Sequence, residues 1–175
     1  MIVKSNWLNQ KSISKDLNLA KELVYDCLDF NCSQPQPVPE SAEYNAYQFC
    51  LDQKNICYRE AKITPVKTGQ FVTLWKRNKS GIIEPFDFSD EIDFVIVSTR
   101  KGDRLGQFVF PKTVLLEKGI FSTPTKEGKR ATRVYPPWAE TTSPQAQKTQ
   151  KWQLQYFYEI IPEVDFETFN KLFQS

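Results

Sequence analysis

The chain has 175 residues, of which 40% are hydrophobic and 14% aromatic, so it can bury the core of one domain. Twenty-three Lys and Arg residues against 21 Asp and Glu leave a net charge of +2, which by itself indicates no particular partner. The absence of histidine excludes Ser-His and Cys-His nucleophile systems and removes the usual nitrogen ligand of zinc. No run of residues approaches the roughly 20 apolar residues that span a bilayer, so we expect a cytoplasmic protein with no membrane segment.

The first predicted element is an amphipathic helix over about residues 14–30. Apolar residues recur there at three- and four-residue steps from Leu17 to Leu28, which places one apolar stripe along a helix. Residues 34–39 follow and contain three prolines, which lack amide donors and disfavour helix in the preceding residue. We expect this proline-rich segment to be an extended arm.

The sheet core is predicted from about residue 44 to 135. Aromatic and β-branched segments alternate in this region with polar or glycine-containing turns. The first two predicted strands are expected to form a hairpin through the polar run 52–55. The predicted strands are residues 44–51, 56–63, 69–77, 92–99, 105–110 and 130–135.

The strand over residues 92–99 is apolar on both alternating faces, which is typical of the centre of a sheet. The charged run 100–104 can turn the chain, so that residues 105–110 pair with this strand. This register would set Asp93 opposite Phe110.

Helices are predicted on both sides of the sheet core. Pro111 and Gly119 bound a short helix, with proline at its start and glycine beyond its end. Ser143 and Pro144 open a longer helix that runs to about Tyr158, and Asp165 can cap a final helix. These C-terminal helices together cover about residues 143–173. The sequence therefore predicts a mixed α+β domain in which helices flank a central, mostly antiparallel or mixed sheet.

A run of five acids with no intervening base precedes the buried strand, and Asp93 is the last of them. Carboxylates gathered at a strand edge can hold Mg²⁺ and activate water, although a solvated acidic turn is the alternative interpretation. Because Asp93 adjoins the apolar residues Ile92 and Phe94, we expect it to be partly buried and to need a partner such as Lys112.

Basic residues gather in two segments of the chain. Residues 59–79 contain six bases and one acid, and residues 100–133 contain nine bases and three acids. Together with nearby tryptophans and tyrosines, they have the composition of a surface that contacts phosphates and stacks on bases. Lysines at strand edges also protect against aggregation, so a solvated surface is the alternative interpretation.

Several blocks of sequence occur in order over roughly residues 40–160, namely residues 61–65, 67, 69–77, 92–94, 106–112, 129–131, 133–138 and 146–153. Together these blocks resemble the MepB family. From this resemblance we expect residues 1–175 to form a single MepB-like domain. The resemblance implies a fold similar to that of type II restriction endonucleases and binding of nucleic acid, with double-stranded DNA as the expected partner.

The resemblance and the basic segments together define the expected binding residues. They are Lys62, Lys67, Gln70, Trp75, Lys76, Arg77, Lys112, Lys129, Arg130, Arg133, Tyr135, Trp138 and Lys151. Alternation over residues 129–135 would set Lys129, Arg133 and Tyr135 on one face of a strand.

Restriction-type nucleases place an Asp on one strand and Glu-x-Lys on the next. Here the strand after Asp93 carries Gln107-Phe108-Val109, which lacks both the second carboxylate and the lysine. We therefore expect binding without cleavage and without a cofactor or metal.

Two alternatives remain at this stage. One is an Mg²⁺-dependent nuclease that uses Asp93 with Glu60 and Lys62, or with Lys112. The other is a module that binds a protein or small ligand through exposed tryptophans around Pro136, Pro137 and Trp138. Nothing in the sequence indicates an oligomeric state.

Overall fold

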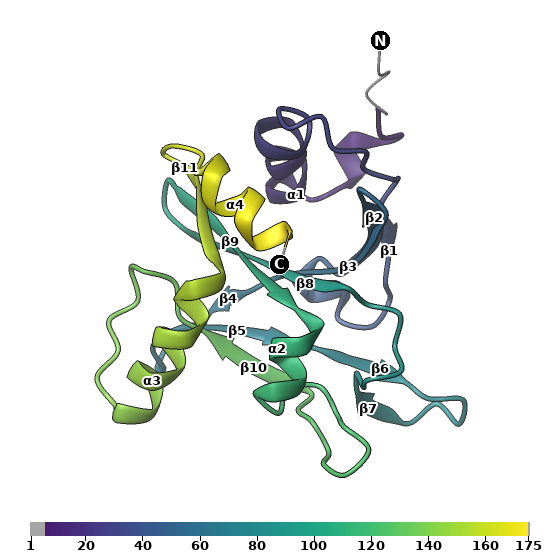
Figure 1. Ribbon diagram of the computed structural model, residues 1–175, viewed down its shortest axis with the longest axis vertical. Coiled ribbons are helices and arrows are strands. Elements are labelled where there is room, and N and C mark those ends of the chain that lie inside the picture. The colour runs from purple at the N-terminus through teal and green to yellow at the C-terminus, as the bar shows by residue number, and fades with distance from the viewer. Residues whose placement is uncertain (1–5, 175) are drawn as a thin grey trace.

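The computed structural model describes residues 6–174 and has the mixed α+β architecture that the sequence predicts (Figure 1). The α-helices of the described chain are α1 Lys15–Ala20, α2 Lys112–Glu117, α3 Pro144–Gln153 and α4 Phe166–Phe173. Its strands are β1 Gln36–Pro37, β2 Tyr47–Leu51, β3 Lys54–Glu60, β4 Lys62–Ile63, β5 Gln70–Thr73, β6 Trp75–Arg77, β7 Ile83–Pro85, β8 Phe94–Lys101, β9 Arg104–Pro111, β10 Ala131–Val134 and β11 Phe157–Ile161. A π-helical turn, Lys21–Tyr25, continues α1.

A six-stranded mixed sheet forms the centre of the molecule, with strand order β1-β2-β3-β8-β9-β11. Strands β3 and β8 are parallel, and every other neighbouring pair in this sheet is antiparallel. The first six residues of β8 are all buried, which confirms the prediction of a central strand near residues 92–99.

The predicted hairpin is formed by β2 and β3, but its turn is tighter than the polar run 52–55. Leu51 pairs with Lys54, so only Asp52 and Gln53 connect the two strands. Both have positive φ, 49° and 70°, which is the backbone conformation of the two-residue turns that match strand twist.

The pairing of β8 with β9 corrects the predicted register by two residues. Val95, not Asp93, lies opposite Phe110, and Phe94 lies opposite Pro111. Pairing continues to Lys101 and Arg104, because Gly102 and Asp103 suffice to turn the chain. The turn is therefore shorter than the predicted one over residues 100–104, and its centre lies between Gly102 and Asp103, which shifts the cross-strand pairs.

The predicted strand over residues 69–77 is divided between two smaller sheets. Strand β5 joins a three-stranded antiparallel sheet of order β10-β5-β4, whereas β6 pairs only with β7 in the described chain. Leu74 separates β5 from β6, and its amide donates a hydrogen bond to the Arg130 carbonyl over 2.8 Å.

Two hydrophobic clusters cover the two faces of the central sheet. On one face, Leu17 of α1 and Phe169 of α4 pack with Tyr58 and Ile96 of the sheet. On the other face, the second cluster joins residues of the three-stranded sheet and α2 to the central strands; it includes Val72, Val114, Val134, Val95 and Phe108. Figure 1 shows α1 and α4 on one side of β8 and β9, with β5, β10, α2 and α3 on the other.

The C-terminal part of the chain differs from the prediction of a helix that runs from Ser143 to about Tyr158. Helix α3 ends at Gln153, and residues 157–161 form β11, which pairs with β9 at the edge of the central sheet. Phe157 and Tyr158 favour a strand, and both are buried there. Asp165 caps α4 by accepting a hydrogen bond from the Thr168 amide, as its position predicts.

The sheet also extends further toward the N-terminus than predicted, because β1 lies within the proline-rich arm and pairs with β2. None of the helices in residues 6–174 combines the length and apolar character needed to cross a membrane.

Candidate nucleic-acid interface

A groove of about 360 Å³ lies beside β10, between the end of α2 and the first turns of α3. Among residues 6–174, four bases line it, Lys67, Lys118, Lys129 and Arg133, and no acid does. We call this feature the basic groove. Three of its four bases were among the residues predicted from sequence, and Lys118 was missed. Because the bases come from separate segments of the chain, only the fold gathers their charges in one concave surface.

The bases of the groove are largely free of ion pairs. Lys118 lies 3.6 Å from the exposed carboxylate of Glu117, a weak surface contact. Within residues 6–174, no ion pair involves Lys67, Lys129 or Arg133. Their positive charges are therefore available to an anionic partner.

The first turn of α3 forms another wall of the basic groove. Ser143 caps this helix by accepting a hydrogen bond from the Ala146 amide, and Pro144 occupies its first position, as predicted. Ser143, Gln145 and Ala146 all line the groove. A helix N-terminus carries partial positive charge, which adds to that of the four bases.

Arg133 also belongs to a row of side chains that crosses the three-stranded sheet. Phe71 pairs with Arg133 on one neighbouring strand and with Lys62 on the other. The Arg133 guanidinium lies 5.6 Å from the centre of the Phe71 ring, and its Nη1 atom is buried without a hydrogen-bond partner. We call Lys62, Phe71 and Arg133 the cross-strand row.

Phe71 is the member of the cross-strand row that sequence reasoning missed. In β5, Gln70 and Val72 are buried while Phe71 and Thr73 are partly exposed. The sequence carried no signal for this, because alternation by polarity would turn the apolar Phe71 inward and the polar Gln70 outward. Tyr44 extends the row, since its ring lies 6.1 Å from Phe71 and 4.8 Å from the Lys62 ammonium.

Lys76, a predicted binding residue, is surrounded by carboxylates instead. Its ammonium lies 2.7 Å from Asp90, 3.0 Å from Asp87 and 3.7 Å from Glu84. Three acids of the predicted acidic run therefore share one lysine. Burial would raise the pKa of Asp87, but hydrogen bonds from Ser89 and Lys76 outweigh that effect and lower the pKa to about 2.

Several other predicted binding residues lie outside the basic groove. The Arg77 guanidinium covers the Trp75 ring at 5.3 Å and lies 3.8 Å from Glu40. Arg130 pairs with Glu127 at 2.9 Å. Lys112 donates a hydrogen bond to the Asp90 backbone carbonyl. Lys151 is exposed on α3 but does not line the groove.

The remaining predicted residues surround the groove and are partly covered by protein. The Tyr135 ring lies against Gly69, where a Cβ would approach it to 2.6 Å. Trp138 packs edge-on against Phe157 at 5.9 Å, beneath the Arg104 guanidinium at 4.8 Å. The prediction of exposed tryptophans around Trp138 is therefore wrong.

Asp93 also differs from its prediction. Its side chain is exposed, not partly buried, and Oδ2 accepts a hydrogen bond from the Asn55 amide over 2.8 Å. Lys112 is not its ion-pair partner, although both residues line one surface depression.

Glu60 lies far from Asp93. In the parallel pair β3 and β8, Glu60 is opposite Ser98, whereas Asp93 precedes Ser98 by five positions. Five residues of strand span roughly 17 Å. Within residues 6–174, no group of three or more His, Cys, Asp or Glu residues is placed to hold a metal ion.

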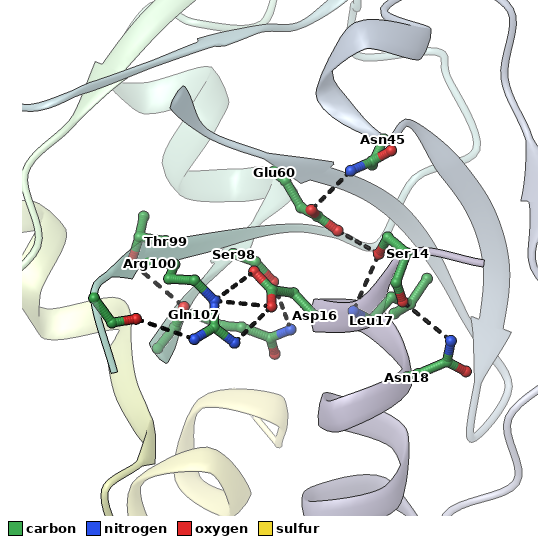
Figure 2. A network of polar contacts seen from close by, with 12 residues as sticks. Ser14, Asp16, Leu17, Asn18, Asn45, Glu60, Ser98, Thr99, Arg100 and Gln107 are labelled. Atoms are coloured by element: carbon green, nitrogen blue, oxygen red, sulfur yellow. Dashed lines mark hydrogen bonds and ion pairs between the residues drawn. The ribbon is translucent and has the colours of Figure 1, made fainter. Parts of the chain in front are cut away.

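Figure 2 shows that Glu60 belongs to a polar network on the α1 side of the central sheet. Its carboxylate accepts hydrogen bonds from Ser14, from Tyr58 at 3.0 Å and from Asn45 at 2.9 Å. Burial raises the pKa of Glu60, and the three donors oppose that shift.

The network continues into the core through hydroxyl groups. The Tyr58 and Ser98 hydroxyl oxygens lie 2.7 Å apart, and Gln107 Nε2 donates to Ser98 over 3.0 Å. Gln107 Oε1 in turn accepts from the buried hydroxyls of Tyr158, at 2.6 Å, and Tyr25, at 3.1 Å. Each polar side chain of this hydrogen-bonded network has a partner within the protein, so the network fixes the packing of α1 and β11 on the sheet.

The fold and the basic groove define a mixed α+β domain with one strongly cationic concave surface. The MepB-like family model matches residues 38–159, and the chain belongs to this family. A crystal structure of MepB is similar over 86% of this chain and 99% of that chain, with 30% sequence identity and a TM-score of 0.74. No curated protein matches the chain.

Proposed function

We propose that this protein binds nucleic acid, with duplex DNA as the first candidate, through the basic groove and the adjoining cross-strand row. The observation that carries the proposal is the lining of the groove, which has four bases and no acid. Phosphate oxygens are the anions that such a surface suits best, because lysine and arginine side chains neutralise them with release of counterions. Contacts of this kind set position and affinity and do not depend on sequence.

Arg133 has the central role in the proposal because it belongs to both surfaces. Its guanidinium stacks near Phe71 while Nη1 has no hydrogen-bond partner in the described chain. A phosphate oxygen would supply the missing acceptor once the guanidinium turns toward the groove. A base or sugar could pack on the partly exposed ring of Phe71.

The proposal does not include cleavage. Asp93 and Glu60 occupy backbone positions separated by roughly 17 Å along the parallel strands, too far for their carboxylates to bind one metal ion. Glu60 is also held by three donors of the protein itself.

Binding of a fluorescent 20-base-pair duplex tests the proposal when it is measured at several salt concentrations. We expect the logarithm of the association constant to fall linearly with the logarithm of salt concentration. Arg133→Glu should weaken binding about tenfold or more, since it replaces a phosphate contact by a repulsive charge.

Lys15→Glu is the matched control. Lys15 is exposed at the first position of α1, on the opposite side of the central sheet, and an acid is favourable at a helix N-terminus. Lys15→Glu changes the net charge by the same amount as Arg133→Glu, but at a position away from the groove. A salt-independent affinity, or equal losses in both variants, would contradict the proposal.

A further inference from the structure

A second cavity, of about 310 Å³, adjoins the basic groove and shares Lys67 with it. Its wall contains Gln70 from the start of β5, Trp138 and Pro136 from the segment after β10, and Lys101 from the end of β8. We call it the Gln70 cavity. Its volume is at the lower end of the range for small-molecule sites, roughly 300–1000 Å³.

Gln70 contributes an unusual group to this cavity. The side chain is only 3% exposed, and its Nε2 donates to the Arg100 backbone carbonyl over 3.3 Å. That bond identifies the other amide atom as the oxygen. This Oε1 atom is buried and has no hydrogen-bond partner in the described chain. A buried acceptor without a donor is unfavourable. Because Gln70 lines the cavity, a ligand that brings an N–H group would satisfy Oε1 once the side-chain amide turns toward it.

The other walls suit a flat ligand. The Trp138 ring is held in place by Phe157 on its edge and by Arg104 over its face. Ile63, which is 64% exposed, and Pro136 add apolar surface. An aromatic wall of this kind favours stacking of a planar heterocycle.

The charges around the cavity are mixed but mainly positive. Lys67 and Lys101 line it together with one acid, the exposed Glu140. Lys67 joins the cavity to the basic groove, so an anion at Lys67 would lie between the two. A planar heterocycle with an N–H donor and a neighbouring phosphate is a nucleotide.

We propose that the Gln70 cavity takes one unpaired base of a nucleic acid whose backbone lies in the basic groove. The base donates an N–H, such as the amino group of adenine, to Gln70 Oε1 and stacks against Trp138. Its phosphate lies near Lys67. This inference rests on the proposed function, which places a nucleic acid in the basic groove. It adds the recognition of one unpaired base.

The test compares two fluorescent single strands of 12 nucleotides, one of deoxyadenosine and one of purine deoxynucleoside, which lacks only the amino group. We expect the protein to bind the adenine strand about five- to tenfold more tightly, the effect of one neutral hydrogen bond. Gln70→Met should remove this preference, because it keeps the approximate size of the side chain and deletes the acceptor. Gln48→Met, an exposed glutamine of β2, is the matched control and should keep it.

The outcomes distinguish this inference from the proposed function. Equal affinity of the unchanged protein for the two strands overturns the base site even if Gln70→Met fails to fold. If Arg133→Glu still weakens both strands, the proposed function stands without the cavity. If neither strand binds in a salt-dependent manner, the proposed function fails as well.

A binding experiment with free adenosine monophosphate distinguishes a base that belongs to a polynucleotide from a free nucleotide. Its binding can be followed by tryptophan fluorescence in the unchanged protein and in Gln70→Met. If the monophosphate alone binds in a Gln70-dependent manner while the two strands bind equally, the proposal of a polynucleotide base is overturned in favour of a free nucleotide.

Discussion

The guanidinium of Arg133 lies 5.6 Å from the centre of the Phe71 ring, across the pairing of β10 with β5. This contact holds a long, flexible side chain at the border between the three-stranded sheet and the basic groove. It joins a delocalised cation to an aromatic face, a combination that an ammonium group reproduces only in part.

Arg133→Lys should therefore weaken nucleic-acid binding while leaving its salt dependence nearly unchanged. The charge is retained, but the planar stacking on Phe71 and the bidentate geometry are lost. We expect a loss of about three- to tenfold in affinity for a fluorescent duplex. Arg133→Ala should in addition reduce the slope against salt by about one. Equal slopes for the lysine and alanine variants would contradict a phosphate contact.

Gln107→Leu should destabilise the fold by about 2–4 kcal/mol in urea denaturation at pH 7. Gln107 is fully buried, and its loss leaves the hydroxyls of Tyr25 and Tyr158 without their acceptor. Adding Tyr158→Phe to this variant should cost less than Tyr158→Phe does alone, because the two residues share one hydrogen bond. Strict additivity of the two substitutions would show that the bond contributes nothing.

Asp87 should make stability depend on pH below about 4. Its folded-state pKa is about 2, below the ordinary value of 3.8, so its ionised form stabilises the folded state above pH 4. That contribution is lost as the pH falls from about 4 to about 2, when the carboxylate gains a proton. Asp87→Asn should reduce the free energy of unfolding at pH 7 by about 1–2 kcal/mol, after allowance for solvent screening.

The measurement for Asp87 is chemical denaturation at pH 7 and at steps between pH 4 and 2. Asp103→Asn, in the exposed turn between β8 and β9, is the control. It should change neither the free energy of unfolding at pH 7 nor its fall between pH 4 and pH 2 appreciably. If the free energy of unfolding of Asp87→Asn falls between pH 4 and pH 2 as much as that of the unchanged protein, Asp87 is not the source of the pH dependence.

Gly106→Ala should destabilise the protein by about 2–4 kcal/mol, because a Cβ at this position of β9 has no room. It would approach the Phe157 ring to 2.2 Å and the Tyr158 carbonyl to 2.8 Å. The expected result is a lower thermal unfolding midpoint, measured beside Gly81→Ala. Gly81, unlike Gly106, has a positive φ, but a Cβ there meets open space, so its substitution should cost only about 1 kcal/mol.

Local sequence patterns predicted the elements whose signals are local. The apolar run before Ser98 identified β8, and the caps at Ser143 and Asp165 identified the starts of α3 and α4. A side chain that must accept from nearby amides needs only its own neighbours to do so. The sequence also identified three of the four bases of the groove as basic residues of interest, but not their proximity.

The sequence pattern failed where a short segment could join either of two structures. Residues 154–158 contain neither glycine nor proline, and only packing against β9 turns Phe157 and Tyr158 into a strand. The Asp93 error arose in the hairpin of β8 and β9, where a small displacement of the turn along the chain shifts every cross-strand pair. A register is set by the whole hairpin and its sheet, not by the residues beside one aspartate.

The sequence by itself determined the fold class and the available chemistry of this protein. It predicted a mixed α+β domain with basic segments at residues 59–79 and 100–133, aromatic residues near them, and no catalysis by histidine. Only the tertiary structure decided which of those residues share a surface. It placed Lys76 among carboxylates and brought Lys118 beside Arg133 in one groove. Charge acts through space over distances set by the fold, whereas capping and periodicity act between residues that are near in the chain.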